Sequence, residues 1–228
     1  MVFTLKAVID TGTMITLSST CLMNVFKSLV EANKIELMVS STIEQESVFT
    51  PLGNKRFALN AARIKHALAD KTVKVIPPDS RIANEQQKIL ELANSCFSSR
   101  DGNVVIIQKG EAEALALARI YGAKALFIDE RTTRSLIENP ARLKEVLERR
   151  QGQSMSMNGE AVNEFREMFS ELRVFRSVDL IALAYEQNLF DHELEHGKLE
   201  LEAALWAAKF SGCAVSEKEI TQYLTAQK

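Results

Sequence analysis

The chain has 228 residues, 46% of them hydrophobic and 25% charged, which is the ordinary balance of a globular protein of one domain with an appendage or two small ones. Its net charge of −2 gives no overall attraction for nucleic acid, so any such binding needs a local basic patch. No run approaches the roughly 18 apolar residues of a membrane span, and the three widely spaced cysteines suggest neither a zinc pair nor a disulfide framework, so we expect a soluble cytoplasmic protein with no membrane partner.

Short apolar runs alternate with longer amphipathic segments in the first two thirds of the chain. We expect strands at residues 5–9, 35–39, 73–76, 103–108 and 125–128. We expect helices at residues 21–32, 43–48, 55–69, 81–97, 110–121, 130–137 and 141–149, with a break at 51–54. Strands that alternate with helices in this way predict an α/β class with a mainly parallel sheet.

The last third of the chain begins with a polar segment at residues 151–159 that has no periodicity and is typical of a linker. After it we expect an extended segment at 173–176 and helices at 160–171, 177–187, 199–210 and 217–226, the last with a capping box formed by Ser216 and Glu219. We therefore divide the chain into a metal-binding core at 1–150 and a second part at 151–228. The second part combines the linker, a candidate edge strand and a helical extension that packs on the core.

Acidic residues stand where two of the predicted strands end and where the helix before the second of them begins. Asp10 and Asp129 each follow an apolar strand, Glu111 and Glu113 open the helix that precedes Asp129, and Glu46 lies early in a short helix. Ligands of α/β sheets bind at the carboxyl ends of the strands. These acids are therefore candidates for a single site at one edge of the sheet.

A cluster of Asp10, Glu46, Glu111 and Asp129 would need a cation. Two carboxylates about 4 Å apart repel each other by roughly 4 kcal/mol at an effective dielectric constant near 20. Hard oxygen ligands in an open site suit Mg²⁺ or Mn²⁺. Such ions ready a water molecule and stabilise the leaving oxygen in phosphodiester hydrolysis.

Simpler explanations exist for the three glutamates. Glu111 and Glu113 are favourable beside the helix dipole, worth about 0.3–1 kcal/mol, and Glu46 is explained equally well as a solvated helix residue. Asp10 and Asp129 are harder to explain in this way, because each ends a strand that must be buried.

Two protease motifs compete with the acidic site. The run Val8–Thr13 matches the Asp-Thr-Gly-Thr signature of aspartic proteases, but that chemistry needs two such aspartates in a β-rich fold. The segment 192–196 matches the His-Glu-x-x-His zinc pattern, with a third ligand to be sought at Glu217 or Glu219. Its charged surroundings indicate a solvated helix start instead, so both protease hypotheses are weaker than the acidic site.

Taken together, these residues resemble the PIN-domain nucleases, which include the VapC-type toxins. Asp10-Thr11-Gly12-Thr13 resembles the opening motif of that family, and Glu46 matches the position of its first glutamate. The run from Gly110 through Arg134 resembles the Gly-Glu-x-Glu version found in a prokaryotic branch. The resemblance covers about residues 5–135, and it implies a three-layer α/β/α fold with a C-terminal helical extension.

The resemblance also implies a function. It implies a metal-dependent endoribonuclease that cuts single-stranded RNA with Mg²⁺ or Mn²⁺, in which Asp10, Glu46, Glu111 and Asp129 bind the metal or orient its water. Glu113 could replace Glu111 as a ligand, and spacing alone does not separate the two. Thr11 or Thr13 would support Asp10 by hydrogen bonding. A homodimer and an antitoxin-like protein are the further partners it implies, and some relatives are catalytically inactive RNA-binding or protein-interaction modules.

Contact with RNA would have to come from basic patches, although charge on an amphipathic helix is usually a solvated surface. Arg131 and Arg134 are the strongest candidates, since they follow Asp129 directly. The other candidates are Lys55, Arg56, Arg63, Lys65, Lys71 and Lys74, and Arg142, Lys144, Arg149 and Arg150.

Overall fold

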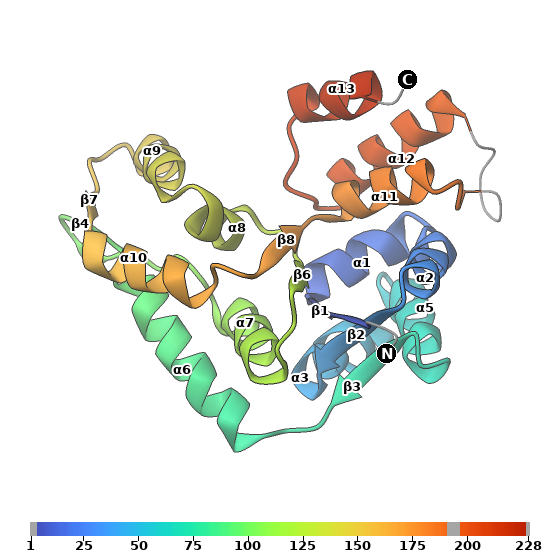
Figure 1. Ribbon diagram of the computed structural model, residues 1–228, viewed down its shortest axis with the longest axis horizontal. Helices are drawn as coiled ribbons and strands as arrows, with labels where there is room; N and C mark the ends of the chain where they lie inside the picture. The colour runs from blue at the N-terminus through green and yellow to red at the C-terminus, as the bar shows by residue number, and fades with distance from the viewer. Residues whose placement is uncertain (1–3, 191–196, 227–228) are drawn as a thin grey trace.

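The computed structural model describes residues 4–190 and 197–226. Its centre is a five-stranded parallel sheet in the order β3-β2-β1-β6-β8 (Figure 1). The strands are β1 (Leu5–Ile9), β2 (Ile35–Ser40), β3 (Val73–Ile76), β6 (Ala125–Phe127) and β8 (Arg173–Phe175). Helices cover both faces of this sheet, so the predicted three-layer α/β/α fold with a mainly parallel sheet is confirmed.

Strand β1 occupies the centre of the sheet and is buried on both faces. Ala7, Val8 and Ile9 are fully buried, and Ile9 lies opposite Phe127 of β6. Successive side chains of a strand point to opposite faces. Ala7 and Ile9 accordingly enter one hydrophobic core and Val8 enters the other. A strand with two buried faces needs a continuous apolar run, which is why the sequence predicts β1 so clearly.

The helices form two layers, one on each face of the sheet (Figure 1). The first layer contains α1 (Thr11–Ser19), α2 (Met23–Ala32), α5 (Ala58–Ala69), α11 (Ser177–Glu186), α12 (Lys198–Phe210) and α13 (Glu217–Ala226). The second contains α6 (Ser80–Asn94), α7 (Lys109–Tyr121), α8 (Arg131–Glu138), α9 (Pro140–Gln151) and α10 (Gly159–Met168). In the described ranges no helix has both the length and the apolar character needed to cross a membrane.

Helix α1 is not among the predicted helices. Its sequence contains Gly12 and several β-branched residues, which have low helix propensity. Tertiary contacts outweigh that propensity, because Met14 and Leu17 are buried in the first core. The helix expected from residue 21 starts instead at Met23, since Cys21 has a left-handed φ of 61° that no helix residue can adopt.

The helical segment after β2 is longer than predicted. It runs without interruption through α3 (Ser41–Glu44), a π-helical turn η1 (Gln45–Phe49) and α4 (Thr50–Leu52). The predicted break at residue 51 therefore falls after Leu52. Pro51 lies at the second residue of α4, directly after the π-helical turn.

A small antiparallel sheet lies apart from the main sheet. It consists of β4 (Phe97–Ser99), β5 (Gly102–Asn103) and β7 (Ser156–Met157). Strand β7 thus lies inside the segment that was expected to be a linker. The strand predicted at 103–108 pairs only at its first residue, and α6 ends at Asn94, where β4 requires the chain to turn.

Candidate metal centre

Asp10 lies where the two central strands of the sheet meet the first helix. Its main-chain N–H donates to the carbonyl oxygen of Phe127 at 2.9 Å, and its Oδ2 accepts from the N–H of Gly12 at 2.9 Å. The second bond caps helix α1. A Cβ atom at position 12 would lie 3.2 Å from Asp10 Oδ2, so the close approach of this carboxylate depends on the glycine.

This setting does not match the aspartic-protease motif. Asp10 starts a helix in a parallel α/β sheet, whereas the aspartic-protease chemistry needs a β-rich fold. The zinc pattern at 192–196 lies outside the described residues. Of its proposed third ligands, Glu219 accepts hydrogen bonds from Ser216 and Arg176.

Asp129 is buried, with only 4% of its surface exposed. Its Oδ1 accepts from the N–H of Ser177 at 2.7 Å, and its main-chain oxygen accepts from the N–H of Ala214 at 3.1 Å. Its Oδ2 is buried and has no hydrogen-bond partner among the residues described. The Cys213 thiol lies nearby, and burial together with the Asp129 charge raises its pKa to about 12.

Glu46 and Glu111 join Asp10 around one open cleft of about 550 Å³. Glu46 projects from the π-helical turn η1 and is exposed. Glu111 is the third residue of α7, and one of its carboxylate oxygens accepts from the N–H of Gln108 in a capping box. Glu111 therefore also stabilises the start of α7, as the simpler explanation of this residue predicts. The remaining lining of the cleft is Thr11, Leu90, Asn94, Val105, Ile107, Gln108, Lys109 and Gly110.

The acids of this cleft interact electrostatically with one another and with Asp129 and Glu130, which do not line the cleft. Burial raises the pKa of the Asp10 carboxyl, and the negative charges of Asp129 and Glu46 raise it further. Burial also raises the pKa of Glu111, to which the charges of Glu130 and Asp10 contribute. Such mutual repulsion is the electrostatic condition that favours a bound cation.

Glu111 and Glu113 face different clefts. Glu111 lies on the Asp10 side of α7, whereas Glu113 lines a second cleft of about 340 Å³. Glu46, Lys109 and Gly110 border both clefts. Of the two glutamates, Glu111 is therefore the one that shares a cleft with Asp10.

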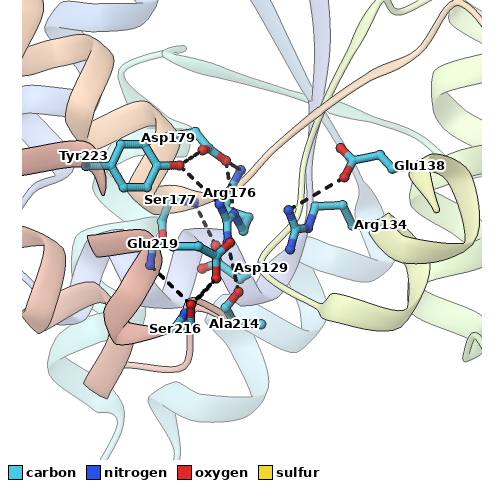
Figure 2. A network of polar contacts seen from close by, with 10 residues as sticks. All are labelled: Asp129, Arg134, Glu138, Arg176, Ser177, Asp179, Ala214, Ser216, Glu219 and Tyr223. Carbon is cyan, nitrogen blue, oxygen red and sulfur yellow. Dashed lines mark hydrogen bonds and ion pairs between the residues drawn. The ribbon is translucent and has the colours of Figure 1, made fainter. Parts of the chain in front are cut away.

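The threonines predicted to support Asp10 and the arginines predicted to bind RNA differ in burial and in their contacts. Thr13 is fully buried, and its hydroxyl has no hydrogen-bond partner in the described ranges. Asp10 is held by the main-chain N–H groups of Thr11 and Gly12 instead of by threonine hydroxyls. Arg131 is exposed at the start of α8, while Arg134 is half-buried and forms an ion pair with Glu138 at 3.7 Å (Figure 2).

Three residues that the sequence analysis did not select also shape this region. Glu130 caps α8 by accepting from the N–H of Thr133 at 2.7 Å. Its position next to Asp129 in the sequence could have indicated that it lies near the site. Asn94 Oδ1 accepts from the N–H of Ile106 at 2.6 Å and so fixes the loop that leads into α7. Ser177 lies 48 residues from Asp129, and no local sequence pattern points to their contact.

A polar network joins the C-terminal helices to this part of the molecule (Figure 2). Arg176, which is 5% exposed, donates to Glu219 at 2.8 Å, to the main-chain oxygen of Ala214 at 3.1 Å and to Tyr223 at 3.1 Å. It also pairs with Asp179 at 3.2 Å. The network holds α13 against α11, next to the N–H of Ser177 that binds Asp129.

The carboxylates match the ligand chemistry of Mg²⁺ or Mn²⁺, which prefer hard oxygen donors. Over residues 4–190 and 197–226, no three acidic, histidine or cysteine side chains converge as a ready-made ion site. The evidence for a metal is therefore the shared cleft and its electrostatics. A comparison with models of known protein families, with curated proteins and with solved structures found no match.

Proposed function

We propose that this protein is a divalent-metal-dependent ribonuclease that hydrolyses phosphodiester bonds of single-stranded RNA. One observation carries the proposal. Asp10, Glu46 and Glu111 come from three separate segments of the chain, yet they line one open cleft at the carboxyl edge of the parallel sheet. That edge is where α/β sheets bind their ligands.

The residues that would hold Mg²⁺ or Mn²⁺ are Asp10, Glu46 and Glu111, with Asp129 adjacent. When bound, the ion would lower the pKa of a coordinated water and stabilise negative charge on the phosphate. Asp10 is suited to this role because its carboxylate is fixed by a main-chain hydrogen bond. Asp129 contributes through its negative charge, which raises the pKa of Asp10.

The chain also supplies groups that suit a polynucleotide. Lys109 is an exposed cation at the border of the cleft, where it can contact a phosphate. Val105 is 70% exposed and lines the same cleft, offering an apolar surface for a base. Arg131 is exposed two residues after Asp129 and is a second candidate for phosphate contact.

A catalytically inactive RNA-binding or protein-interaction module is the second candidate. It is favoured by the lack of three converging ligands in the described part of the chain and by the use of one Glu111 oxygen as a helix cap. Such a module would bind RNA without cutting it. Metal-dependent cleavage therefore separates the two functions.

The test is cleavage of a fluorescently labelled single-stranded RNA in Mn²⁺ or Mg²⁺. We expect wild-type cleavage and its loss in Asp10→Asn, which removes a charge but preserves the shape and the helix cap. Asp101→Asn is the matched control, because Asp101 is exposed in the turn between β4 and β5. Equal cleavage by the wild type and Asp10→Asn would reject the catalytic proposal. RNA binding without cleavage in either ion would support the inactive module.

A further inference from the structure

The second cleft lies beside the acidic one, on the other side of the first turn of α7. It has a volume of about 340 Å³ and extends past the ends of β2 and β3. Lys109 and Gly110 separate the two clefts, and Glu46 borders both. A chain molecule lying in the acidic cleft would therefore meet the second cleft next.

The second cleft combines apolar walls with polar groups of both kinds: the hydroxyls of Ser40, Ser41 and Thr42 and the ammonium group of Lys109 can donate hydrogen bonds, and three carboxylates accept them. Ile76, Pro77, Pro78 and Ile82 supply the apolar surface. Gln86 donates its amide to the main-chain oxygen of Lys109 at 2.8 Å, which leaves the Gln86 oxygen as an acceptor. This composition suits a flat apolar group that carries hydrogen-bond donors and acceptors at its edge.

Besides Glu46, which borders both clefts, two acidic side chains line the second cleft. They differ in whether their carboxylates are already engaged in hydrogen bonds. Asp79 caps α6 and accepts from the main chain and the guanidinium of Arg81, with the shortest contact at 2.6 Å. Glu113 forms no hydrogen bond or ion pair with any residue that the structure describes, and it is half-buried. Glu113 is therefore the acceptor that remains free to meet a ligand.

These features favour a nucleobase and disfavour a phosphate. A carboxylate repels phosphate oxygens but accepts hydrogen bonds from the amino groups of guanine, adenine and cytosine. Uracil has no amino group, and its single N–H is flanked by two carbonyl oxygens that a carboxylate would repel. A carboxylate facing a base thus discriminates between bases by their amino groups.

Gly110 borders both clefts. A Cβ atom at Gly110 would meet no other atom within 4 Å, so the glycine leaves open space at this point. Lys109 also borders both clefts and supplies a cation between them. We propose that the second cleft binds the base adjoining the phosphate held in the acidic cleft and selects bases with an exocyclic amino group. This inference rests on the proposed function, because it assigns that function a base preference.

The experiment uses the four ribonucleosides as probes, because they lack phosphate and their binding needs no metal. The full-length protein labelled with ¹⁵N is titrated with guanosine, adenosine, cytidine and uridine. The amide signal of Gly110 reports binding. We expect this signal to shift with the three amino-bearing nucleosides and not with uridine. We expect the shift to be lost in Glu113→Ala and kept in Glu202→Ala, which removes the same charge from an exposed position on α12.

Equal shifts with uridine, no shift with any nucleoside, or an unchanged response in Glu113→Ala would overturn the base cleft. The spectrum itself reports whether each variant is folded, so unfolding cannot imitate a loss of binding. The two proposals fail separately. RNA cleavage without a nucleoside response rejects only the base cleft, and a nucleoside response without cleavage rejects only the nuclease.

Discussion

The buried guanidinium of Arg176 donates to the carboxylate of Glu219 at 2.8 Å and thereby fixes α13 against α11. Arg176 also donates to Asp179 and Tyr223, so one guanidinium group binds side chains from both helices (Figure 2). The residue after Arg176 donates the main-chain hydrogen bond that Asp129 accepts. The stability of the C-terminal helices and the position of a candidate site residue are therefore linked.

Replacing Arg176 by Met should destabilise the protein strongly. The substitution leaves the carboxylates of Asp179 and Glu219 without their cation, and breaking such a buried pair typically costs about 3–5 kcal/mol. The free energy of unfolding, measured by urea denaturation, tests this. Arg173→Met, at an exposed position of β8, is the control and should change stability little. A loss below about 1 kcal/mol in Arg176→Met would contradict the role of the network.

Glu219 should make stability depend on pH in the acid range. Burial alone raises its pKa, but hydrogen bonds from Ser216 and Arg176 outweigh burial and lower the pKa to about 2 from 4.5. A carboxyl whose folded pKa is depressed contributes its full stabilisation above the unfolded pKa and loses it as the pH falls through the folded pKa. Between about pH 6 and about pH 3, wild type should therefore lose more stability than Glu219→Gln. Glu217→Gln, on the same helix and mostly exposed, should behave as wild type.

Gly12→Ala should reduce activity more than stability. The added methyl group would sit 3.2 Å from Asp10 Oδ2 and displace the carboxylate by a few tenths of an ångström. Alanine also favours the helix by about 0.5–1 kcal/mol, which offsets part of the strain. We expect RNA cleavage to fall about tenfold, equivalent to about 1.4 kcal/mol of activation energy. Gly159→Ala, at a helical position with open space around it, should leave cleavage unchanged.

Mn²⁺ should stabilise the folded protein if the acidic cleft binds it. A ligand at about 100 times its dissociation constant stabilises by about 2.7 kcal/mol, which corresponds to a rise of roughly 5–10 °C in Tm for a chain of this size. The rise should be absent in Asp10→Asn and present in Asp101→Asn. Thermal unfolding with and without Mn²⁺ measures it, and equal shifts in all three proteins would place the ion elsewhere.

The three cysteines should differ in reactivity. Cys21 is exposed, whereas burial raises the pKa of Cys96 to about 11 and that of Cys213 to about 12. Because the thiolate is the reactive form, only Cys21 should react with a thiol reagent near neutral pH. A colorimetric thiol assay should count one group in the native protein and three in denaturant. Rapid reaction of a second native thiol would contradict the packing around Asp129 or β4.

The strands of this fold are predictable where they are short and mostly apolar runs. The runs at residues 5–9 and 73–76 are short, apolar and rich in β-branched residues, and both match the observed strands. Helix α1 is not predictable in this way, since tertiary burial of Met14 and Leu17 outweighs its poor local propensity. Local pattern thus reveals an element only where local and tertiary preferences agree.

The candidate site likewise contains residues that the local sequence pattern predicts and contacts that it does not predict. The acids that end β1 and β6 stand out because a charge directly follows a buried strand, and the acids at the start of α7 stand out because they open a helix. The separation of Glu111 from Glu113 depends on how α7 is rotated between two clefts. The contact of Asp129 with Ser177 depends on where β8 joins the sheet. Both are properties of packing that residue spacing does not contain.

The bond between Asp129 and Ser177 sets an order of assembly during biosynthesis. The donor follows its acceptor by 48 residues, so the ribosome needs roughly 2–10 s to make it once Asp129 has been added. Until then β6 is an edge strand, and Asp129 lacks the main-chain donor that it has in the folded protein. An interrupted nascent chain that stops before β8 therefore carries Asp10, Glu46 and Glu111 but lacks the anchor for Asp129. Synthesis of the last quarter of the protein completes the acidic site.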